Sequence, residues 1–539
     1  MSRGALAVGV LLLQVGCAST PRQAAAQISA GFWDADERVL ITDFQRVTAL
    51  ARSPDQLFAA TDGGLVVRSD AFERWELPVT REDGYPEAQV LALAYDTRDA
   101  TLWMATSDAR LVQFEPFGRR FLDEFSIGRA GSRIVPAAGG TSELYVLQGS
   151  EWVSVDPFSR AIDRVGPGVV REAIARDFDL SRRSELLQDL RFDAARAFLG
   201  RRGPARYEVT DVMPSNSPGR FWVATYGGFL EIYDSFSGAA EPVEYGLIGR
   251  GVAAVLAVEG DLWFAPLRPT DRYGVSRADE DLETWRVWGD GSIISDEPDA
   301  PDEPVHALVA TGDGVWAGGD RLYRYDGEHW VREPLGNRAG DFPIRSLAEG
   351  PEGLEGVWVG TERGLYRIPS PGAGPEGPLA NARDVRALAA VGPDLWVGTD
   401  FGIARVRSVD GLPQVVGTGA APPGPVGALA AYAGRLYAGI GRDVWVFEGD
   451  AWTRAAPLGA LAAPVTALAV RDGVAWIGSD EGVLVWDTRE DVVTHLTFAA
   501  GDLPWDAREG RGVFGIAIEA DGAGWVATPA GAIRFELDR

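Results

Sequence analysis

Lysine is missing from this sequence, and cysteine, methionine and histidine are almost missing. All 51 basic residues are arginine, and 539 residues include 1 Cys, 3 Met and 3 His. A single cysteine excludes an internal disulfide, and three scattered histidines make a histidine-rich metal site improbable. The 78 acidic residues bring the net charge to −27. This charge argues against a nucleic-acid partner, because phosphate contacts need a basic surface.

Long apolar runs are also scarce, and the one at the N-terminus is informative. Met1–Arg3 is followed by the apolar residues 4–16, which are too few to span a membrane permanently and predict an export signal within residues 1–26. Cys17 follows directly, between Gly16 and Ala18. This arrangement resembles a bacterial lipobox, so we expect lipidation at Cys17 and membrane contact through that anchor only. Cleavage after Ala26, which would release a secreted protein, is the alternative.

The sequence is rich in one repeated strand–turn–strand unit. Its clearest copy, residues 395–406, has large and β-branched residues, then the turn Asp400–Gly402, then a second strand. A period near 40 residues with one hairpin per unit predicts β-propeller blades. The aromatic residue of each copy stands at position 58, 103, 145, 222, 263, 316, 358, 396, 437, 476 or 525.

Each unit is predicted to hold four strands. An apolar strand such as Val385–Leu388 precedes the hairpin, and a looser strand such as Trp330–Glu333 follows it. Eleven such blades favour an all-β propeller protein with two rings over one large ring, since single rings usually have four to eight blades. The last blade ends one strand short, so we expect residues 38–44 to supply its missing strand and close the ring. Both chain ends would then share one ring, with the other ring inserted between them, or the whole array would form one circle.

The repeat resembles the two-component regulator propeller repeat, whose consensus runs roughly L-W-I-G-T, two variable residues, then G-L. The matching copies are residues 357–366, 395–403 and 475–487. In that family the repeats often form the periplasmic sensor of a membrane-bound histidine kinase. The resemblance therefore implies a propeller with a sensor-like binding role. Because the sequence ends at Arg539, directly after the last hairpin, we expect it to act without a kinase domain.

The wide spacing between positions 145 and 222 predicts an insertion. We expect blades 1–3 in residues 38–168, a helical insertion in 169–203, and blades 4–11 in 204–539. Within the insertion Leu187, Leu190, Ala194 and Phe198 share one face at helical spacing. The insertion is either a clamp over a propeller mouth or a partner-binding arm. Its basic residues, which a solvated helix face would also explain, are Arg182, Arg183, Arg191, Arg201 and Arg202.

Few residue patterns in the sequence suggest catalysis. The histidines His306, His329 and His495 are expected in an inner strand, an outer strand and another outer strand, each as an ordinary core or surface residue. The acidic stretch 290–303, within the insertion 279–304, is expected to be a solvated loop rather than a calcium site. No nucleotide, zinc or nucleophile motif is present, so we expect no cofactor, metal or catalytic residue.

Three functions fit these features. The favoured one is a non-catalytic, membrane-anchored propeller of the bacterial cell envelope, periplasmic or on the outer membrane, that binds a protein or glycan. A propeller hydrolase or lyase acting on an extracellular polysaccharide or a lactone is the alternative, and it predicts His306 or carboxyl groups of raised pKa around a central channel. A purely structural role in envelope assembly is the third.

Overall fold

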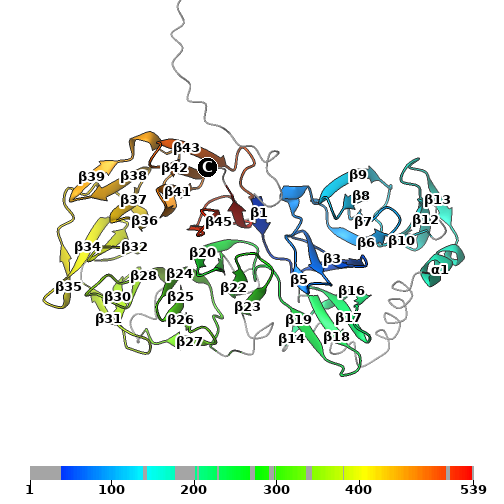
Figure 1. The fold of residues 1–539 in the computed structure, drawn as a ribbon, viewed down its shortest axis with the longest axis horizontal. Coiled ribbons are helices and arrows are strands. Elements are labelled where there is room, and N and C mark those ends of the chain that lie inside the picture. Colours follow the sequence, from blue (N-terminus) through cyan, green and yellow to red (C-terminus); the bar gives the residue numbers. More distant parts are fainter. Residues whose placement is uncertain are drawn as a thin grey trace, which may run out of the picture.

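Nearly all of the repeat region folds into regular sheets. The computed structural model describes residues 38–536, except 138–141, 177–200, 203–204, 228–229, 268–272, 290–296, 298, 336–342, 380–381, 460 and 506–509. Over the described residues the chain forms eleven four-stranded antiparallel sheets and one two-stranded sheet. Each four-stranded sheet is one blade, so the predicted number of blades is confirmed. The blades divide into two side-by-side units (Figure 1).

Seven blades form a closed ring. Each innermost strand packs against the innermost strands of both neighbouring blades, and β20 closes the circle by packing against both β24 and β44. From the innermost strand outward, the blades are β20 (Val252–Val258), β21 (Asp261–Pro266), β22 (Gly274–Asp279) and β23 (Trp285–Gly289); β24 (Val305–Thr311), β25 (Gly314–Gly319), β26 (Leu322–Tyr325) and β27 (Trp330–Glu333); β28 (Ile344–Glu349), β29 (Val357–Thr361), β30 (Gly364–Ile368) and β31 (Glu376–Leu379); β32 (Val385–Val391), β33 (Asp394–Thr399), β34 (Gly402–Val409) and β35 (Leu412–Val416); β36 (Val426–Tyr432), β37 (Arg435–Ile440), β38 (Asp443–Glu448) and β39 (Ala451–Arg454); β40 (Val465–Arg471), β41 (Val474–Ser479), β42 (Gly482–Asp487) and β43 (Val492–Thr497); and β44 (Gly515–Ile518), β45 (Gly524–Thr528), β46 (Gly531–Phe535) and β1 (Arg38–Ile41).

The remaining four blades form a second unit, inserted in the chain between β1 and β20. Its innermost strands pack in the order β16, β2, β6, β10. The blades are β2 (Val47–Arg52), β3 (Gln56–Thr61), β4 (Leu65–Ser69) and β5 (Arg74–Trp75); β6 (Val90–Asp96), β7 (Thr101–Thr106), β8 (Arg110–Glu115) and β9 (Arg120–Ser126); β10 (Arg133–Pro136), β11 (Leu144–Gln148), β12 (Glu151–Val155) and β13 (Ile162–Val165); and β16 (Glu208–Pro214), β17 (Arg220–Tyr226), β18 (Leu230–Asp234) and β19 (Ala240–Val243). Short 3-10 helices cover Arg81–Asp83 (η2) and Ala456–Leu458 (η3).

The N-terminal strand closes the ring as the sequence predicts. β1 pairs antiparallel with β46, with Arg38 opposite Phe535 and Ile41 opposite Ala532. The strand is shorter than the predicted 38–44, because the chain leaves the sheet after Ile41 and Phe44 packs in a core between the two units. Leu40 faces the core shared with β41 and β42. The last blade therefore takes one strand, β1, from the N-terminal end of the described chain and three, β44–β46, from its C-terminal end.

A helix stands in the predicted insertion. α1 (Pro167–Arg176) packs on the blade that begins with β10, where Val170 and Ala173 are buried against Val135 and Tyr145. The predicted helix carrying Leu187, Leu190, Ala194 and Phe198 lies outside the described residues. A small hairpin of β14 (Arg201–Arg202) and β15 (Ala205–Arg206) follows, so residues 201–202 of the predicted helical insertion lie in a strand.

Glycine after the aromatic residue of the repeat lets neighbouring blades approach closely. A Cβ added to Gly398 would lie 2.5 Å from Val426 Cγ1, in the first strand of the next blade. The same close approach occurs at Gly318, Gly360, Gly439 and Gly478. Trp396, two residues before Gly398, is 1% exposed and fills the space between blades. The repeat therefore encodes the packing between blades as well as the strands.

Each blade has two kinds of end, which define two faces. Turns between second and third strands, together with the blade-to-blade connections, lie at the upper face. Turns between first and second strands and between third and fourth strands lie at the lower face, where they bond to each other: the Asp70 amide donates to the Asp55 carbonyl at 2.9 Å, and the Ser235 amide to the Gly219 carbonyl at 2.8 Å. β1 begins opposite the lower end of β46, at the outer rim of the ring, where the Arg38 side chain reaches the connections that hold Glu82 and Gly501.

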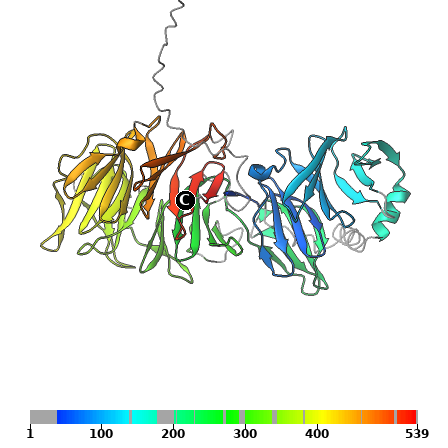
Figure 2. The ribbon, with the colours of Figure 1, turned by 45° about the horizontal axis from the view of Figure 1, so that its top comes forward.

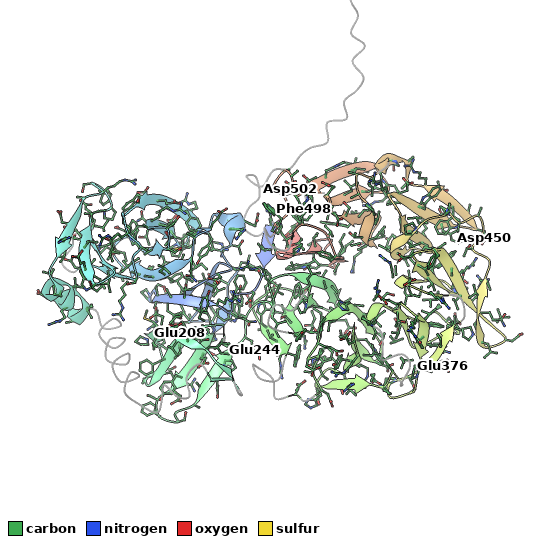
Figure 3. The ribbon with its side chains drawn as sticks, turned by 180° about the vertical axis from the view of Figure 1, so that it is seen from behind. Glu208, Glu244, Glu376, Asp450, Phe498 and Asp502 are labelled. Carbon is green, nitrogen blue, oxygen red and sulfur yellow. The ribbon has the colours of Figure 1, made fainter. Side chains whose placement is uncertain are left out.

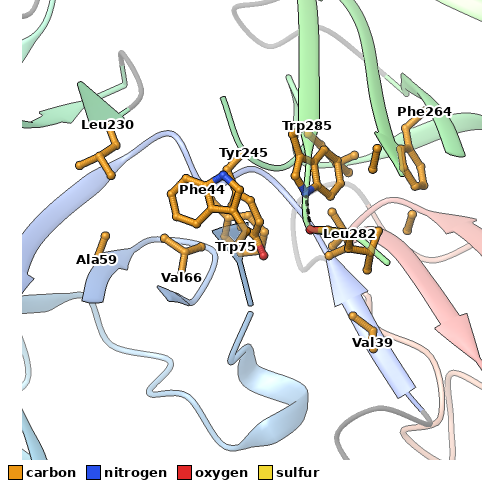
Figure 4. Close-up of a cluster of buried hydrophobic side chains, with 14 of the residues drawn as sticks. Val39, Phe44, Ala59, Val66, Trp75, Leu230, Tyr245, Phe264, Leu282 and Trp285 are labelled. Atoms are coloured by element: carbon orange, nitrogen blue, oxygen red, sulfur yellow. Dashed lines mark hydrogen bonds between the residues drawn. The ribbon is translucent and has the colours of Figure 1, made fainter. Parts of the chain in front are cut away.

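An aromatic core joins the two units (Figure 4). The Tyr245 ring lies 4.3 Å from Trp75, 5.3 Å from Phe44 and 5.5 Å from Trp285, measured between ring centroids. The Trp75 indole N–H donates to the Glu244 carbonyl at 3.1 Å. Phe44 and Tyr245 lie in the two linkers that join the units, residues 42–46 and 244–251. Trp75 and Trp285 lie in the outermost strands β5 and β23, so the two units share one hydrophobic core.

The two units face the same way. At the upper face the linkers 42–46 and 244–251 bond to each other, with the Leu247 amide donating to the Thr42 carbonyl at 3.1 Å. At the lower face Arg74, the first residue of the outermost strand β5 of the four-bladed unit, lies 2.6 Å from Glu283, which stands in a third-to-fourth-strand turn of the ring. Blades also follow one another in the same rotational sense in both units (Figure 1). The lower faces of the units are therefore continuous, and the two units also lie side by side in the tilted view (Figure 2).

A buried arginine links the units near the start of β1. Arg38 forms an ion pair with Glu82 of η2 and donates to the Gly501 carbonyl at 3.2 Å. Asp502 lies beside β1 (Figure 3). Burial raises the pKa of Glu82 and of Asp502, and the charge of Arg38 opposes both shifts. These groups lie between units and on no innermost strand, so we treat them as a structural contact.

Candidate ligand-binding face of the ring

The innermost strands of the ring share an irregularity at their upper ends. In six of them the pairing with the second strand shifts by one residue near the start of the strand. Such a bulge re-aims a side chain and is common next to binding sites. The bulge residues are Ala253, His306, Arg345, Arg386, Gly427 and Thr466, and Phe514 stands at the corresponding place before β44. Because the innermost strands surround the ring axis, we call these seven residues the upper circle.

Three consecutive blades place a basic side chain in the upper circle. His306, Arg345 and Arg386 are all exposed. Arg345 forms an ion pair with Glu362, and the Arg386 guanidinium donates to Asp400 at 2.7 Å. Both carboxylates stand in the turn between second and third strands of the same blade as their arginine. One half of the upper circle therefore carries two arginine charges, each fixed by a neighbouring turn, beside His306.

His306 is the one titratable group of this row that changes charge near neutral pH. Loss of water around it lowers the pKa of His306, although part of its side chain still reaches solvent. The negative charge of Asp320 opposes that shift and the positive charge of Arg345 adds to it. The imidazole is therefore neutral at pH 7 and can both donate and accept a hydrogen bond.

The other half of the upper circle is small or apolar. Ala253, Gly427, Thr466 and Phe514 occupy it, and Phe514 is 41% exposed. The Thr466 hydroxyl is already used, because it donates to the Val513 carbonyl at 2.6 Å. Phe401, in the turn after Asp400, is 81% exposed beside the charged half. Apolar surface next to a few fixed polar groups is the usual composition of a ligand site.

The circle offers binding groups rather than an evident reaction centre. Among the residues that the structure describes, no group of three His, Cys, Asp or Glu side chains is placed to hold a metal ion. Arg345 and Arg386 are both paired with carboxylates. The carboxyl groups whose pKa is raised stand on turns and connections, not on innermost strands; they are Asp70, Glu82, Asp83, Glu244, Glu303 and Asp502. Ionic and aromatic recognition is therefore the chemistry that this face can supply.

The predicted site residues lie mostly beyond the described chain. Cys17, Arg182, Arg183 and Arg191 are outside the described residues. Arg201 and Arg202 form β14, and their backbone pairs with β15. Lipidation and partner binding by the basic insertion therefore stay predictions.

The three histidines fall close to their predicted places. His306 is in the innermost strand β24 and His495 in the outermost strand β43. His329 lies in the turn just before β27 rather than within it, where its side chain is 72% exposed and 3.8 Å from Glu297. The three come from two different blades and do not meet.

The described part of the acidic loop is held by arginine. Arg321 lies 2.9 Å from Asp302 and 3.3 Å from Glu303, and the Tyr323 hydroxyl donates to Asp302 at 3.1 Å. Residues 290–296 and 298 lie outside the described residues, so calcium binding there stays open. A helix long and apolar enough to cross a membrane does not occur in the described part of the chain.

Sequence reasoning missed the upper circle, although its signal was present. The first strands share the pattern Val385-Arg386-Ala387-Leu388, and aligning Val305-His306-Ala307-Leu308 and Ile344-Arg345-Ser346-Leu347 beneath it places the three basic residues in one column. The pattern showed where the strand was. It did not show that the variable second residue sits in a bulge.

Solved structures resemble the chain in fold at low identity. PorZ, described as an essential bacterial surface component of the type-IX secretion system of Porphyromonas gingivalis, matches over 93% of this chain and 87% of its own, with 12% identity and a TM-score of 0.52. The extracellular domain of the putative hybrid two-component system BT3049 from B. thetaiotaomicron matches over 90% of this chain, with 14% identity and a TM-score of 0.43. This chain spans 61% of the length of that domain.

Comparisons of the amino-acid sequence with known families and proteins found no match. No protein-family model matches the chain, and no curated protein matches it. The chain is a multi-bladed β-propeller protein.

Proposed function

We propose that this chain is an exported, membrane-anchored β-propeller of the bacterial cell envelope that binds a protein or glycan ligand without transforming it. The observation that carries the proposal is the upper circle of the ring. Its basic row of His306, Arg345 and Arg386 faces small and apolar residues across the ring axis, with Phe401 exposed beside it. Such a surface suits recognition of a polar ligand with an apolar or sugar face.

Export and anchoring rest on the N-terminal sequence. Residues 1–16 predict an export signal, and Cys17 follows it as in a lipobox. The description of PorZ as a surface component supports a place in the envelope for a chain of this fold. Replacing Cys17 by Ser should abolish incorporation of labelled fatty acid and move the protein from the membrane to the soluble envelope fraction. Label retained by the variant would contradict lipidation.

The ligand proposal is tested with envelope extract. The chain and the double variant Arg386→Ala/Phe401→Ser are immobilised, and captured proteins and glycans are identified by mass spectrometry. We expect a ligand that the unaltered chain captures and the double variant loses at least about tenfold. Arg489→Ala, in an exposed turn of the lower face, is the matched control and should capture normally. Equal capture by all three proteins would contradict binding at the upper circle.

The alternative, a hydrolase or lyase, needs a proton-transfer group on the ring axis. His306 is the one innermost-strand histidine in the described chain, and its lowered pKa leaves it available as a base. Chemical change of a captured polysaccharide or lactone, lost in His306→Asn, would favour the alternative.

A further inference from the structure

Four phenylalanines project from one face of the four-bladed unit. Phe72, Phe117, Phe158 and Phe236 are 72%, 101%, 82% and 82% exposed. Each stands in the turn between the third and fourth strands of its blade, so every blade of the unit carries one. Single exposed apolar side chains are common on protein surfaces, but their recurrence at the same turn of every blade calls for an explanation.

Turn geometry does not require phenylalanine there. The Phe158 and Phe236 amides donate to Asp156 and Asp234, two residues earlier, at 2.9 and 2.8 Å. In the ring, the Arg489 amide donates to Asp487 in the same way at 2.8 Å. A polar side chain thus occupies the same turn position without loss of the turn. The phenylalanines are not explained by folding.

The ring lacks this feature. Six of its seven blades have a described turn between the third and fourth strands, and none of these six turns contains phenylalanine: they are residues 280–284, 326–329, 369–375, 410–411, 449–450 and 488–491. The one large apolar residue that they hold, Leu282, is 3% exposed within the core between units. Exposed phenylalanine at this turn is therefore confined to the four-bladed unit.

The four side chains project separately rather than forming one patch. Polar or small residues flank each of them, as in Asp156-Pro157-Phe158-Ser159-Arg160 and Asp234-Ser235-Phe236-Ser237-Gly238. Protein interfaces bury a continuous core around their anchor residues. Separate phenylalanine side chains on one face suit a lipid bilayer, because each side chain can insert into the bilayer independently of the others.

The charged residues next to the phenylalanines are compatible with contact with a lipid bilayer. Arg160 lies 3.0 Å from Asp123, and Arg120 lies 2.8 Å from Glu115, so cations next to two of the phenylalanines are paired. Backbone N–H groups lower the pKa of Asp234, and the Ser159 hydroxyl and backbone N–H groups lower that of Asp156, so both remain ionised. These carboxylates and the net charge of −27 disfavour an anionic surface.

The position of the chain start points to the same occupant. The phenylalanines lie at the lower face, which continues from the four-bladed unit into the ring through Arg74 and Glu283. β1 begins opposite the lower end of β46, at the outer rim of the ring, and the predicted lipidation site Cys17 precedes it in the sequence.

We propose that the lower face of the four-bladed unit rests on a zwitterionic lipid bilayer, with Phe72, Phe117, Phe158 and Phe236 inserted at the headgroup level. The contact orients the protein so that the upper circle of the ring faces away from the bilayer. The inference goes beyond ligand binding and does not depend on which ligand the ring takes.

The test uses vesicles of phosphatidylethanolamine and phosphatidylcholine. A chain starting at Ile28 retains every described strand and omits both the apolar run 4–16 and Cys17, which would bind lipid by themselves. It should co-sediment with the vesicles, and Phe117→Ser/Phe158→Ser/Phe236→Ser should reduce its partition coefficient by at least about tenfold per side chain removed. The control Phe401→Ser removes an equally exposed phenylalanine from the upper face and should bind unchanged. Circular dichroism confirms that each variant is folded.

Site-specific labelling gives a second readout. The chain from Ile28 has no cysteine, so Phe158→Cys and Phe401→Cys each accept one polarity-sensitive fluorophore. We expect a blue shift on addition of vesicles for the label at 158 and none for the label at 401. No sedimentation of the unaltered chain, equal loss in Phe401→Ser, or equal shifts at both labels would overturn the proposal. So would stronger binding to anionic than to zwitterionic vesicles.

Discussion

The ring and the four-bladed unit are built from one repeat but have diverged in what surrounds its aromatic residue. In five blades of the ring the aromatic is followed two residues later by glycine, whereas the four-bladed unit has Ala60, Ala105, Leu147 and Ala224 there. An arginine stands opposite the tryptophan in five ring blades, as Arg405 does opposite Trp396. The four-bladed unit has Val67, Gln113, Ser154 and Ile232 at that place.

The difference extends to the surface. The ring shares its last blade between the two ends of the described chain and carries its charges on the upper circle. The four-bladed unit draws each blade from one continuous segment and carries exposed phenylalanines at its lower face. We infer that the ring is specialised for tight closure and ligand recognition, and the four-bladed unit for contact with a surface.

Breaking the closure strand should have the largest effect. Leu40 of β1 is 5% exposed in the core shared with β41 and β42, so Leu40→Asp buries a charge and should cost about 4 kcal/mol or more of ring stability. Ile162→Asp, in an outermost strand of the four-bladed unit where Ile162 is 41% exposed, should cost within about 0.5 kcal/mol.

Hydrogen exchange separates the two units in this experiment. Amides of β44–β46 should lose protection in Leu40→Asp while those of β6–β8 keep it. Equal loss in both units would mean that the chain unfolds as one cooperative body and that closure is not a property of the ring alone.

Sequence alone was sufficient for the blades and for their closure. Trp396, Gly398 and the turn at Asp400 fix a strand, a close approach and a hairpin within eight residues, so the local pattern determines the blade. The division into seven and four blades depends on which inner strands meet, as β20 and β44 do, across more than 250 residues. No local pattern encodes that meeting. Similarly, the upper circle depends on a bulge, and neither alternation nor composition reveals a bulge.

The glycine that follows the aromatic gives a prediction of intermediate size. In Gly398→Ala the new Cβ would lie 2.5 Å from Val426 Cγ1, which is too close, so neighbouring blades must separate at a cost of about 1–3 kcal/mol. Val426→Ala in the same chain should recover part of that loss. Gly417→Ala, where a Cβ would meet nothing within 4 Å, is the control. In the four-bladed unit the reverse change, Ala105→Gly, should cost about 1–2 kcal/mol, because it frees the backbone of the unfolded chain and removes a buried methyl group. Urea midpoints measure all four, and a neutral Gly398→Ala would show that blades in the ring are no closer than elsewhere.

The smallest effect is expected at the ion pair beside the tryptophan. Asp394 forms an ion pair with Arg405 and lies 2.6 Å from Arg407. In the four-bladed unit Thr101 stands at the position of Asp394 and Gln113 at that of Arg405. There the Gln113 side-chain amide donates to the Thr101 hydroxyl at 3.2 Å. Burial alone would raise the pKa of Asp394, but its hydrogen bonds to Arg407 and Arg405 outweigh burial and lower it.

A carboxyl group whose pKa is lower in the folded state stabilises the fold above its unfolded pKa of about 4 and loses that contribution as pH falls through the folded value. Asp394→Thr/Arg405→Gln makes the ring site resemble that of the four-bladed unit. It should cost about 1–2 kcal/mol at pH 7 and progressively less below about pH 4. Urea unfolding of both proteins at pH 7 and pH 3 measures the difference. A difference that persists unchanged at pH 3 would assign it to packing of Arg405 on Trp396, whose ring centroid is 5.2 Å from the guanidinium carbon, rather than to the ionised carboxylate.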